Sequence, residues 1–438
     1  MDFALKNKID RRLRQLKRDG VKFISGTIAP SEASLDEKSI ESIERAVQYY
    51  RERGGSSLNL SVQPKWMGSR GQLYLFRDKL QESFYVTRNG FTIKYGSGRV
   101  KNIDKSIKHW YNKFFKDKNY VDYIEVILDG ELMPWNAVGE GLIQRSFVGY
   151  SIAVDNELSF LEENGFEVAQ TTLEHSTGLA EYNESSDTDK SKNPLRETYE
   201  LFLNNMSNVF VGEQKEAIDE FKSQLNLYNV ETDPYYVAFD IIRMKRADGS
   251  INVDNGWMAS TQAKYNALQM MWPREAKDVM KKIDALLLEE SNHYQYSSVN
   301  IDIRDIFKVP TYLSESNMFE TYLKEVMEIL MEVGFEGFML KPDYPEDTEA
   351  VHCMKVRNPK YLKLIYGHDY DITDESLEHH ISKKRTAKKR KLSHNEYRLG
   401  KKMLKLNESS PTYDEDFEKI AKAILFEIEE ESTVDHRL

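Results

Sequence analysis

Two kinds of apolar periodicity alternate along this chain. Apolar residues that recur every three or four positions indicate helices, whereas apolar residues that alternate with polar ones indicate strands. The helical spacing predicts helices over residues 1–20, 37–53, 100–118, 158–228 and 262–290. The alternating spacing predicts strands within 56–76, 83–95, 123–133, 233–244, 335–342 and 352–367. Strands separated by helices and hairpins, without a regular strand–helix–strand rhythm, predict an α+β fold.

Turn and loop signals divide these elements. Asp248–Gly249 is typical of a hairpin turn after the strand that ends near residue 244. The polar stretch 182–194 interrupts a helical pattern and predicts a mobile loop. Beyond Tyr370 the pattern is charged and helical to the last residue, so this part has too few strand signals to build a β-barrel.

Composition restricts the class of protein. The 438 residues carry 61 Lys and Arg against 72 Asp and Glu, a net charge of -11, so a nucleic-acid binder of this composition must concentrate its basic residues locally. The single cysteine, Cys353, excludes an internal disulfide and a multi-cysteine zinc site. With no secretory signal and no apolar run long enough to span a bilayer, we expect a cytoplasmic protein without a membrane partner.

Two segments combine features of polynucleotide binding. Residues 105–118 interleave lysines with aromatic residues, which suits a single strand with stacked bases, although a helix whose aromatic face packs inward is the favoured interpretation. Residues 383–391 are strongly basic, and 414–432 are acidic and amphipathic. The basic run therefore either binds phosphate or pairs with the acidic segment, and the sequence favours neither.

The segment with the most chemical information is PKWMGSRG. Lys65 ends a strand-like run, and a lysine can act as a covalent nucleophile once it is deprotonated. Gly68 permits close backbone approach to a ligand, and Arg70 can direct two hydrogen bonds to phosphate or ribose oxygens. Alone this pattern is weak, but other polar or aromatic residues follow in or beside apolar strands in a fixed order. They are Glu131, Phe239, Glu336 and Lys355.

In this order the sequence resembles the covalent nucleotidyltransferase superfamily of polynucleotide ligases and RNA-capping enzymes, which has six ordered motifs. The corresponding segments are Lys65–Arg70, Thr87–Gly90, Asp129–Glu131, Phe239–Ile242, Glu336–Lys341 and Lys355–Arg357.

A closer resemblance is to the ligase domain of bacterial polynucleotide kinase-phosphatase RNA-repair enzymes, and it covers about residues 40–370. Five features carry it: AVQYYRERG before the nucleophile strand, MGSR in the first motif, ELMPW in the third, EGLI just after it, and KYLKLIYG after the last.

The resemblance implies a role for each candidate residue. Lys65 attacks the α-phosphorus of ATP and holds AMP, Arg70 and Glu131 bind the ribose, and Phe239 stacks on adenine. Gln63 lies at the position of an adenine contact. Glu336 binds a divalent cation, Mg²⁺ or alternatively Mn²⁺. The remaining phosphate-binding candidates are Arg88, Lys341, Lys355 and Arg357.

The sequence departs from the family pattern at four positions. Met67 stands where most superfamily members have Asp, and Trp66 replaces the His that this branch usually has. Gln63 stands where a Glu is common, which puts the adenine contact in doubt. Arg357 takes a place that many ligases give to Lys, which keeps the charge and changes the geometry.

These expectations combine into a domain plan and a function. Residues 1–36 form a basic extension, 37–370 an α+β nucleotidyltransferase domain of antiparallel sheets with a helical insert at about 158–230, and 371–438 a helical region without an OB barrel. The predicted function is an ATP-dependent RNA ligase that joins 3′-OH to 5′-phosphate ends of tRNA or of nicked or broken RNA.

Alternative functions stay open at this point. They are a DNA nick ligase, a capping-type guanylyltransferase, or a non-catalytic RNA-binding module on the same fold. Because no kinase phosphate-binding loop or phosphatase metal cluster is visible in the sequence, a separate end-healing kinase or phosphatase is the expected partner.

Overall fold

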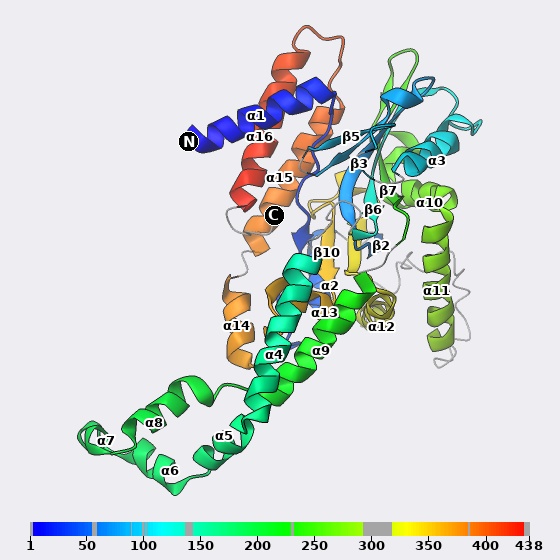
Figure 1. Ribbon diagram of the computed structural model, residues 1–438. Helices are drawn as coiled ribbons and strands as arrows, with labels where there is room; N and C mark the ends of the chain where they lie inside the picture. Colours follow the sequence, from blue (N-terminus) through cyan, green and yellow to red (C-terminus); the bar gives the residue numbers. More distant parts are fainter. Residues whose placement is uncertain are drawn as a thin grey trace. The chain divides into compact units, whose positions relative to one another are not determined.

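The computed structural model describes residues 3–54, 59–88, 90–98, 100, 103–135, 143–228, 232–291, 318–383 and 386–432. The chain divides into two compact units, each considered by itself below. Unit 1 comprises Met1–Glu140, Leu227–Pro359 and Ile381–Leu438, and unit 2 comprises Gly141–Asn226 and Lys360–His380. Unit 1 contains both sheets and every candidate site residue (Figure 1).

The larger sheet of unit 1 is antiparallel throughout its described pairs. Its strand order is β5 (Thr92–Lys94), β4 (Phe84–Thr87), β3 (Ser69–Phe76), β6 (Tyr123–Met133), β7 (Tyr235–Arg246) and β8 (Ile251–Asn252). Gly249, with φ of +86°, forms the predicted turn between β7 and β8. Successive strand residues serve opposite faces: Leu73 and Leu75 join one buried cluster and Tyr74 the other.

The smaller sheet has the order β1 (Ala29–Pro30), β10 (Met354–Arg357), β9 (Gly337–Pro342) and β2 (Leu60–Lys65). Its β10–β9 and β9–β2 pairs are antiparallel, as expected for this fold class. The β1–β10 pair is parallel, a pairing that the predicted antiparallel sheets did not include. A segment from far upstream, residues 21–31, therefore reaches the edge of this sheet beside Lys355.

Helices cover both faces of the larger sheet in unit 1. On one face the cluster includes residues of α3 (Ile103–Phe115) and α10 (Thr261–Met271), and on the other residues of α1 (Phe3–Asp19) and α16 (Tyr413–Ser432). The remaining helices of this unit are α2 (Ile43–Gly54), α11 (Arg274–Ser291), α12 (Met318–Val333) and α15 (Thr386–Leu404). Short 3₁₀ turns lie at Leu80–Glu82, Gly256–Ala259 and Pro345–Asp347. In α3, Trp110 and Phe114 are buried, as the packing interpretation of 105–118 expects.

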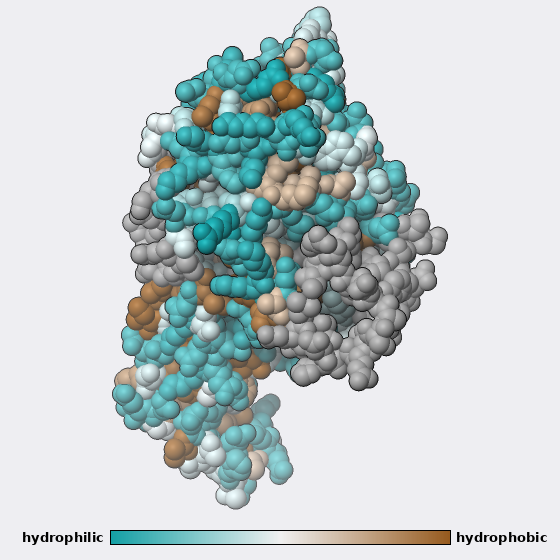
Figure 2. Space-filling view, turned by 90° about the vertical axis from the view of Figure 1, so that its right-hand side faces the viewer, coloured by the Kyte–Doolittle hydropathy of each residue, from teal (hydrophilic) through white to brown (hydrophobic). Residues whose placement is uncertain are grey.

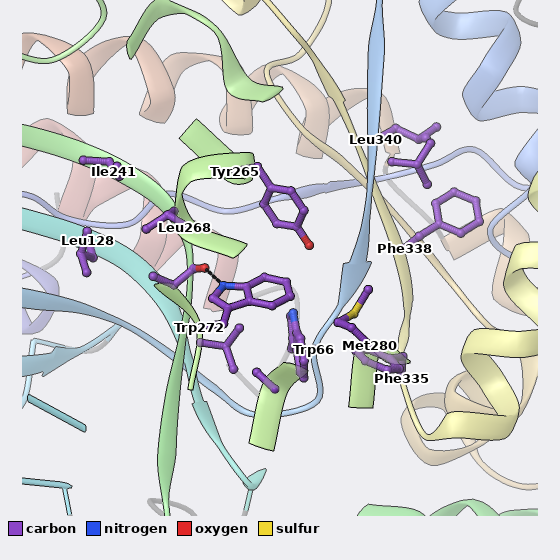
Figure 3. Close-up of a cluster of buried hydrophobic side chains, with 14 of the residues drawn as sticks. Trp66, Leu128, Ile241, Tyr265, Leu268, Trp272, Met280, Phe335, Phe338 and Leu340 are labelled. Carbon is purple, nitrogen blue, oxygen red and sulfur yellow. Dashed lines mark hydrogen bonds between the residues drawn. The ribbon is translucent and has the colours of Figure 1, made fainter. Parts of the chain in front are cut away.

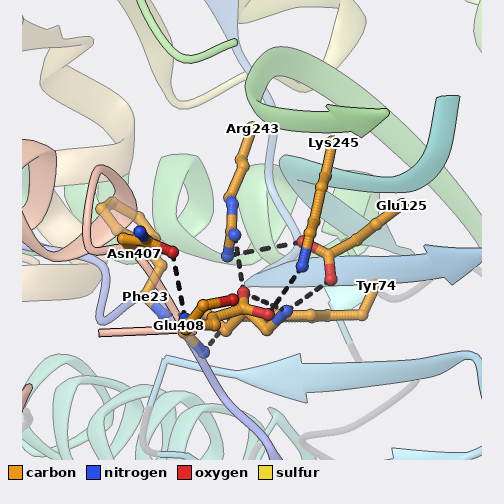
Figure 4. A network of polar contacts seen from close by, with 9 residues as sticks. Phe23, Tyr74, Glu125, Arg243, Lys245, Asn407 and Glu408 are labelled. Atoms are coloured by element: carbon orange, nitrogen blue, oxygen red, sulfur yellow. Dashed lines mark hydrogen bonds and ion pairs between the residues drawn. The ribbon is translucent and has the colours of Figure 1, made fainter. Parts of the chain in front are cut away.

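A buried polar network anchors the loop between α15 and α16 to the larger sheet (Figure 4). The Glu408 carboxylate accepts hydrogen bonds from Arg243 (2.6 Å) and Lys245 (2.8 Å) of β7, and pairs with Lys22 at 2.7 Å. Arg243, only 2% exposed in its side chain, also lies 3.4 Å from Glu125 of β6. These cations hold the pKa of Glu408 far below its usual range, although burial alone would raise it.

Unit 2 is helical in its described residues. Its helices are α4 (Gly149–Glu163), α5 (Phe166–Glu174), α6 (Thr177–Glu184), α7 (Asp187–Lys192) and α8 (Arg196–Leu201), together with most of α9 (Val211–Tyr228), α13 (Pro359–Tyr366) and α14 (Asp374–Lys383). It also has π-helical turns at Ile143–Val148 and Phe202–Met206. Figure 2 shows a mainly hydrophilic face with separate hydrophobic areas. In unit 2, Phe160 (64%) and Val168 (72%) are among the exposed apolar residues.

Two expectations about local structure were wrong. The polar stretch 182–194 includes helix α7, because the Ser186 side chain caps its first turn by accepting from the Asp189 amide. Only Met354–Arg357 of 352–367 is a strand: Pro359 then starts α13, where its fixed φ and missing N–H suit the first helical position. In the described part of the chain, no helix combines the length and apolarity needed to cross a membrane.

Candidate active site

The pairing of β2 with β9 brings Lys65 and Glu336 together. Lys65 lies opposite Gly337, the amide of Glu336 donates to the Lys65 carbonyl at 3.1 Å, and the two side chains form an ion pair. Gly337 has φ of +139°, and a Cβ there would lie 2.2 Å from the Val356 carbonyl oxygen. Only glycine fits this position without a backbone shift, so the backbone of β9 and β10 fixes where Glu336 enters the site.

The pairing of β3 with β6 places Arg70 opposite Glu131, the two predicted ribose ligands. The guanidinium of Arg70 binds a different carboxylate, with Nη2 donating to Asp129 Oδ2 at 2.7 Å, and it also donates to the Gly26 carbonyl at 3.2 Å. Burial alone would lower the pKa of Arg70, but Asp129 raises it above its ordinary value. Arg70 is therefore a fixed cation in the wall of the site.

Glu131 and Glu336 are two buried carboxylates close to Lys65. Burial raises the pKa of Glu131 to about 8; the Lys65 ammonium opposes this shift and the Glu336 charge adds to it. Among the residues that the structure describes, no group of three or more His, Cys, Asp or Glu side chains could hold a metal ion. A pair of carboxylates does fit Mg²⁺, which takes few protein oxygens and keeps water or substrate phosphate as its other ligands.

Phe239 lies next to the cationic side of the site. Its ring is half-buried in β7, with Lys341 Nζ 4.9 Å and Arg70 Cζ 5.9 Å from its centre. Lys341 donates to Gln63 Oε1 at 2.7 Å, and burial lowers its pKa. Gln63 itself is 2% exposed. The predicted adenine and phosphate residues are thus neighbours, with Gln63 engaged by Lys341.

The remaining predicted cations come from two places, β10 and the residue after β4. Lys355 on β10 has a pKa lowered to about 7, by burial first and then by Arg357. Arg357 pairs with Glu41 at 2.5 Å, and Arg88, beyond the end of β4, donates to Thr27 Oγ1 at 3.1 Å. Lys355 and Arg357, two positions apart on β10, therefore lie on the same face of the smaller sheet.

Trp66 is a core residue. Its ring packs edge-on against Trp272 and Phe335, at 5.6 and 4.8 Å between ring centres, and its side chain is buried (Figure 3). Trp272 in turn donates its ring N–H to the Ala238 carbonyl at 2.7 Å. The residue that stands where the resemblance predicts His therefore packs the end of β2 into the core.

Sequence reasoning missed the acidic residues that hold these cations. Asp129 binds Arg70, Glu41 binds Arg357, and Asp240 pairs with Lys264 at 2.5 Å. Asp129 was within reach of prediction, because strand alternation puts it on the same face as Glu131. Glu41 had no such signal, since its partner lies more than 300 positions away. Two segments of the resemblance, Asn89 and Glu140–Leu142, lie outside the described residues.

Comparison with known proteins tests the predicted class. A family described as "PNKP adenylyltransferase domain, ligase domain" matches residues 16–210 and 314–422. Two solved structures match over 100% of both chains. One, "Structure of Pnkp1/Rnl/Hen1 complex", has a TM-score of 0.73 at 20% identity; the other, "Structure of the Pnkp1/Rnl/Hen1 RNA repair complex", has 0.74 at 19%. At this identity they show a shared fold. No curated protein matches.

The fold and the matched sequence define an adenylyltransferase domain of the ligase class. The two matched ranges include most of the chain and all candidate residues except Phe239. The chain belongs to the PNKP ligase family, which confirms the predicted resemblance.

Proposed function

We propose that this chain is an ATP-dependent RNA ligase that seals 3′-OH to 5′-phosphate ends through a covalent lysyl-AMP intermediate. The observation that carries the proposal is the pairing of β2 with β9, which holds Lys65 against Glu336 beside the buried Glu131. A lone lysine in an ion pair is common on protein surfaces. Here it lies among Arg70, Lys341 and Lys355, so a nucleophile and several phosphate-binding cations share one site.

The proposed chemistry uses these residues in order. The Lys65 amine gives up its proton and forms a bond to the α-phosphorus of ATP, while the bond to the pyrophosphate oxygen breaks. Lys341 and Lys355 neutralise the non-bridging oxygens, as transfer at phosphorus requires. AMP then passes to a 5′-phosphate oxygen, and the 3′-OH displaces it. Phe239 offers the stacking surface for adenine.

The divalent cation is assigned to Glu336, with Glu131 beside it. When bound, Mg²⁺ would neutralise charge on the phosphate oxygens. Burial is the main cause of the raised pKa of Glu131, and the nearby Glu336 carboxylate adds to it. A cation beside the two carboxylates would favour their charged forms, which supports the assignment. Before ATP arrives, the ion pair with Lys65 partly satisfies Glu336.

RNA is the proposed substrate, and an end-healing protein the proposed partner. The two similar structures are described as complexes of Pnkp1, Rnl and Hen1, and one of them as an RNA repair complex. The matched family is a ligase domain, whereas the kinase and phosphatase that prepare ends would come from another chain. This division of labour supports RNA repair over DNA sealing or capping.

The test is label transfer from ATP that carries radioactivity in its α-phosphate, with Mg²⁺ or Mn²⁺. We expect the purified chain to keep the label through a denaturing gel, and Lys65→Ala to keep none. Lys94→Ala, an exposed lysine on β5, is the matched control and should label normally. Absence of label on the unmodified chain with either metal would overturn the proposal.

Substrate choice is tested with the same preparation. We expect label from ATP and none from GTP, which separates a ligase from a guanylyltransferase. Sealing of nicked or broken RNA in preference to the matching DNA would support RNA as substrate; the reverse preference would favour the DNA ligase alternative.

A further inference from the structure

Helix α15 has a polar stripe on the side that faces the protein. Thr386, Lys389, Ser393 and Glu396 follow one another at helical spacing, and Thr386 (7% exposed), Ser393 (0%) and Glu396 (1%) are buried. Lys389, between them, is partly buried. The inward side of a packed helix is normally apolar, as it becomes here at Met403 and Leu404. Glu396 accepts a hydrogen bond from the Thr27 amide, so this polar side of α15 faces residues 21–31.

The stripe lies against the strand that neighbours Lys355. Helix α15 packs on β1, and β1 pairs in parallel with β10 so that Pro30 lies opposite Lys355. The residue after Lys389, Arg390, forms an ion pair with Glu32 and lies 4.9 Å from the Tyr49 ring centre. Figure 1 shows α15 running beside the N-terminal segment near β10. The first turns of α15 therefore border the part of the site that contains Lys355.

The charges around Lys355 do not cancel. Lys65 pairs with Glu336, and Arg357 pairs with Glu41. The ammonium groups of Lys355 and Lys389 have no ion-pair or hydrogen-bond partner among the residues that the structure describes. Lys389 is also close enough to contribute to the lowered pKa of Lys355. The single Glu41 carboxylate lies near Arg357 and acts on Lys355 as well, so Lys355, Arg357 and Lys389 together keep a net positive charge. Such a partly buried cationic group suits an anion with more than one charge.

We propose that Lys389 of α15 binds the pyrophosphate portion of the nucleoside triphosphate, next to Lys355 at the α-phosphate. The inference rests on the proposed function. Lys389 lies outside the six sequence motifs that suggested that function. When the Lys65 nitrogen–phosphorus bond forms and the phosphorus–oxygen bond breaks, the electron pair goes to the pyrophosphate oxygen. The Lys389 ammonium stabilises that charge, so helix α15 takes part in the first reaction step and in its reversal.

The test separates the step that involves pyrophosphate from the one that does not. In Lys389→Ala we expect lysyl-AMP formation to slow about 100-fold, the size of loss found when one group that stabilises developing charge is removed. Release of AMP from labelled enzyme by added pyrophosphate should weaken similarly. Sealing of an RNA strand that already carries the 5′-AMP cap should be unchanged, because that step involves no pyrophosphate.

Matched variants make the result specific. Lys391→Ala, an exposed lysine of the same helix, should behave like the unmodified chain, and Lys389→Arg should restore part of the lost rate. Equal loss in capped-strand sealing would assign Lys389 to RNA or to folding and overturn the inference, as would no loss in either step. If the unmodified chain forms no lysyl-AMP, the proposed function itself fails, a result that no Lys389 variant can produce.

Discussion

At the scale of single residues, the site combines ionisable groups shifted in opposite directions. Glu131 has a pKa of about 8 and Lys355 one of about 7, each displaced mainly by burial toward its neutral form. Burial disfavours charge on either type of group, so both shifts have the same origin. A bound triphosphate would favour the protonated, charged form of Lys355, and a bound metal ion would favour the deprotonated, charged form of Glu131. Each ligand would place an opposite charge beside the group.

The shift of Glu131 predicts how stability depends on pH. Between its ordinary value of 4.5 and about 8, the folded chain keeps a proton that the unfolded chain has lost. The free energy of unfolding therefore falls as pH rises through this range, by up to about 1.4 kcal/mol for each unit of difference in pKa. Glu131→Gln should flatten this decline between pH 5 and pH 7, as measured by urea unfolding.

The control for this prediction is Glu82→Gln, an exposed carboxylate that should leave the slope unchanged. The pH range stops at 7 because Lys355 contributes the opposite trend above that value: its folded pKa is depressed, so stability rises between about 7 and 10.5. Identical slopes for Glu131→Gln and the unmodified chain would contradict the assignment of a protonated Glu131.

At the scale of elements, residues 21–31 join the two sheets of unit 1 under helix α15. The backbone amides of Lys22 and Phe23 donate to the Tyr74 hydroxyl on β3, and the amide of Ser31 donates to the Lys355 carbonyl on β10. Between these ends, the Thr27 amide donates to the buried Glu396 carboxylate of α15. Residues 21–31 thus depend on α15 for their position. They also provide the oxygen atoms to which the Arg70 and Arg88 side chains donate.

Glu396→Ala tests this dependence. Loss of a charged acceptor from a buried amide should cost about 1–3 kcal/mol. Amide hydrogen exchange should become faster in residues 21–31, with α3 and β6 little changed. Arg398→Ala on the exposed side of α15 serves as the control. Unchanged exchange in 21–31 would show that the sheets alone hold the segment.

At the scale of the molecule, the two ends of the chain close one face of the larger sheet. Ile9, Leu13 and Leu16 of α1 pack in one buried cluster with residues of α16, including Phe417, Ala421, Ile424 and Leu425. Ion pairs join Lys8 and Arg12 to Glu429, and Lys17 to Asp414. The acidic C-terminal helix therefore pairs with the basic N-terminal helix.

Leu13→Ala should lower the free energy of unfolding by about 2–5 kcal/mol, since it opens a cavity between the terminal helices. Lys17→Ala, which removes a largely exposed ion pair, should change it by less than about 1 kcal/mol. Chemical unfolding of both variants checks the difference. Equal effects would mean that charge, and not apolar burial, holds the ends together.

The sequence predicted the elements better than their partners. Local spacing was enough for the strands of the larger sheet and for α1, α2 and α3, because burial on one face imposes a period on nearby residues. It failed where capping or a single proline decided the outcome, at α7 and α13. Each depends on one residue within a pattern that otherwise suggests a loop or a strand.

The sequence by itself determined the family and the set of candidate residues, since the identity and order of Lys65, Glu131, Glu336 and Lys355 are properties of the chain. Only the tertiary structure decided which carboxylate holds each cation, that Trp66 is core, and that α15 borders the site. The physical reason is that electrostatic partners and buried contacts depend on distances of a few ångströms. Those distances are set by pairing between segments hundreds of residues apart, which leaves no local pattern in the sequence.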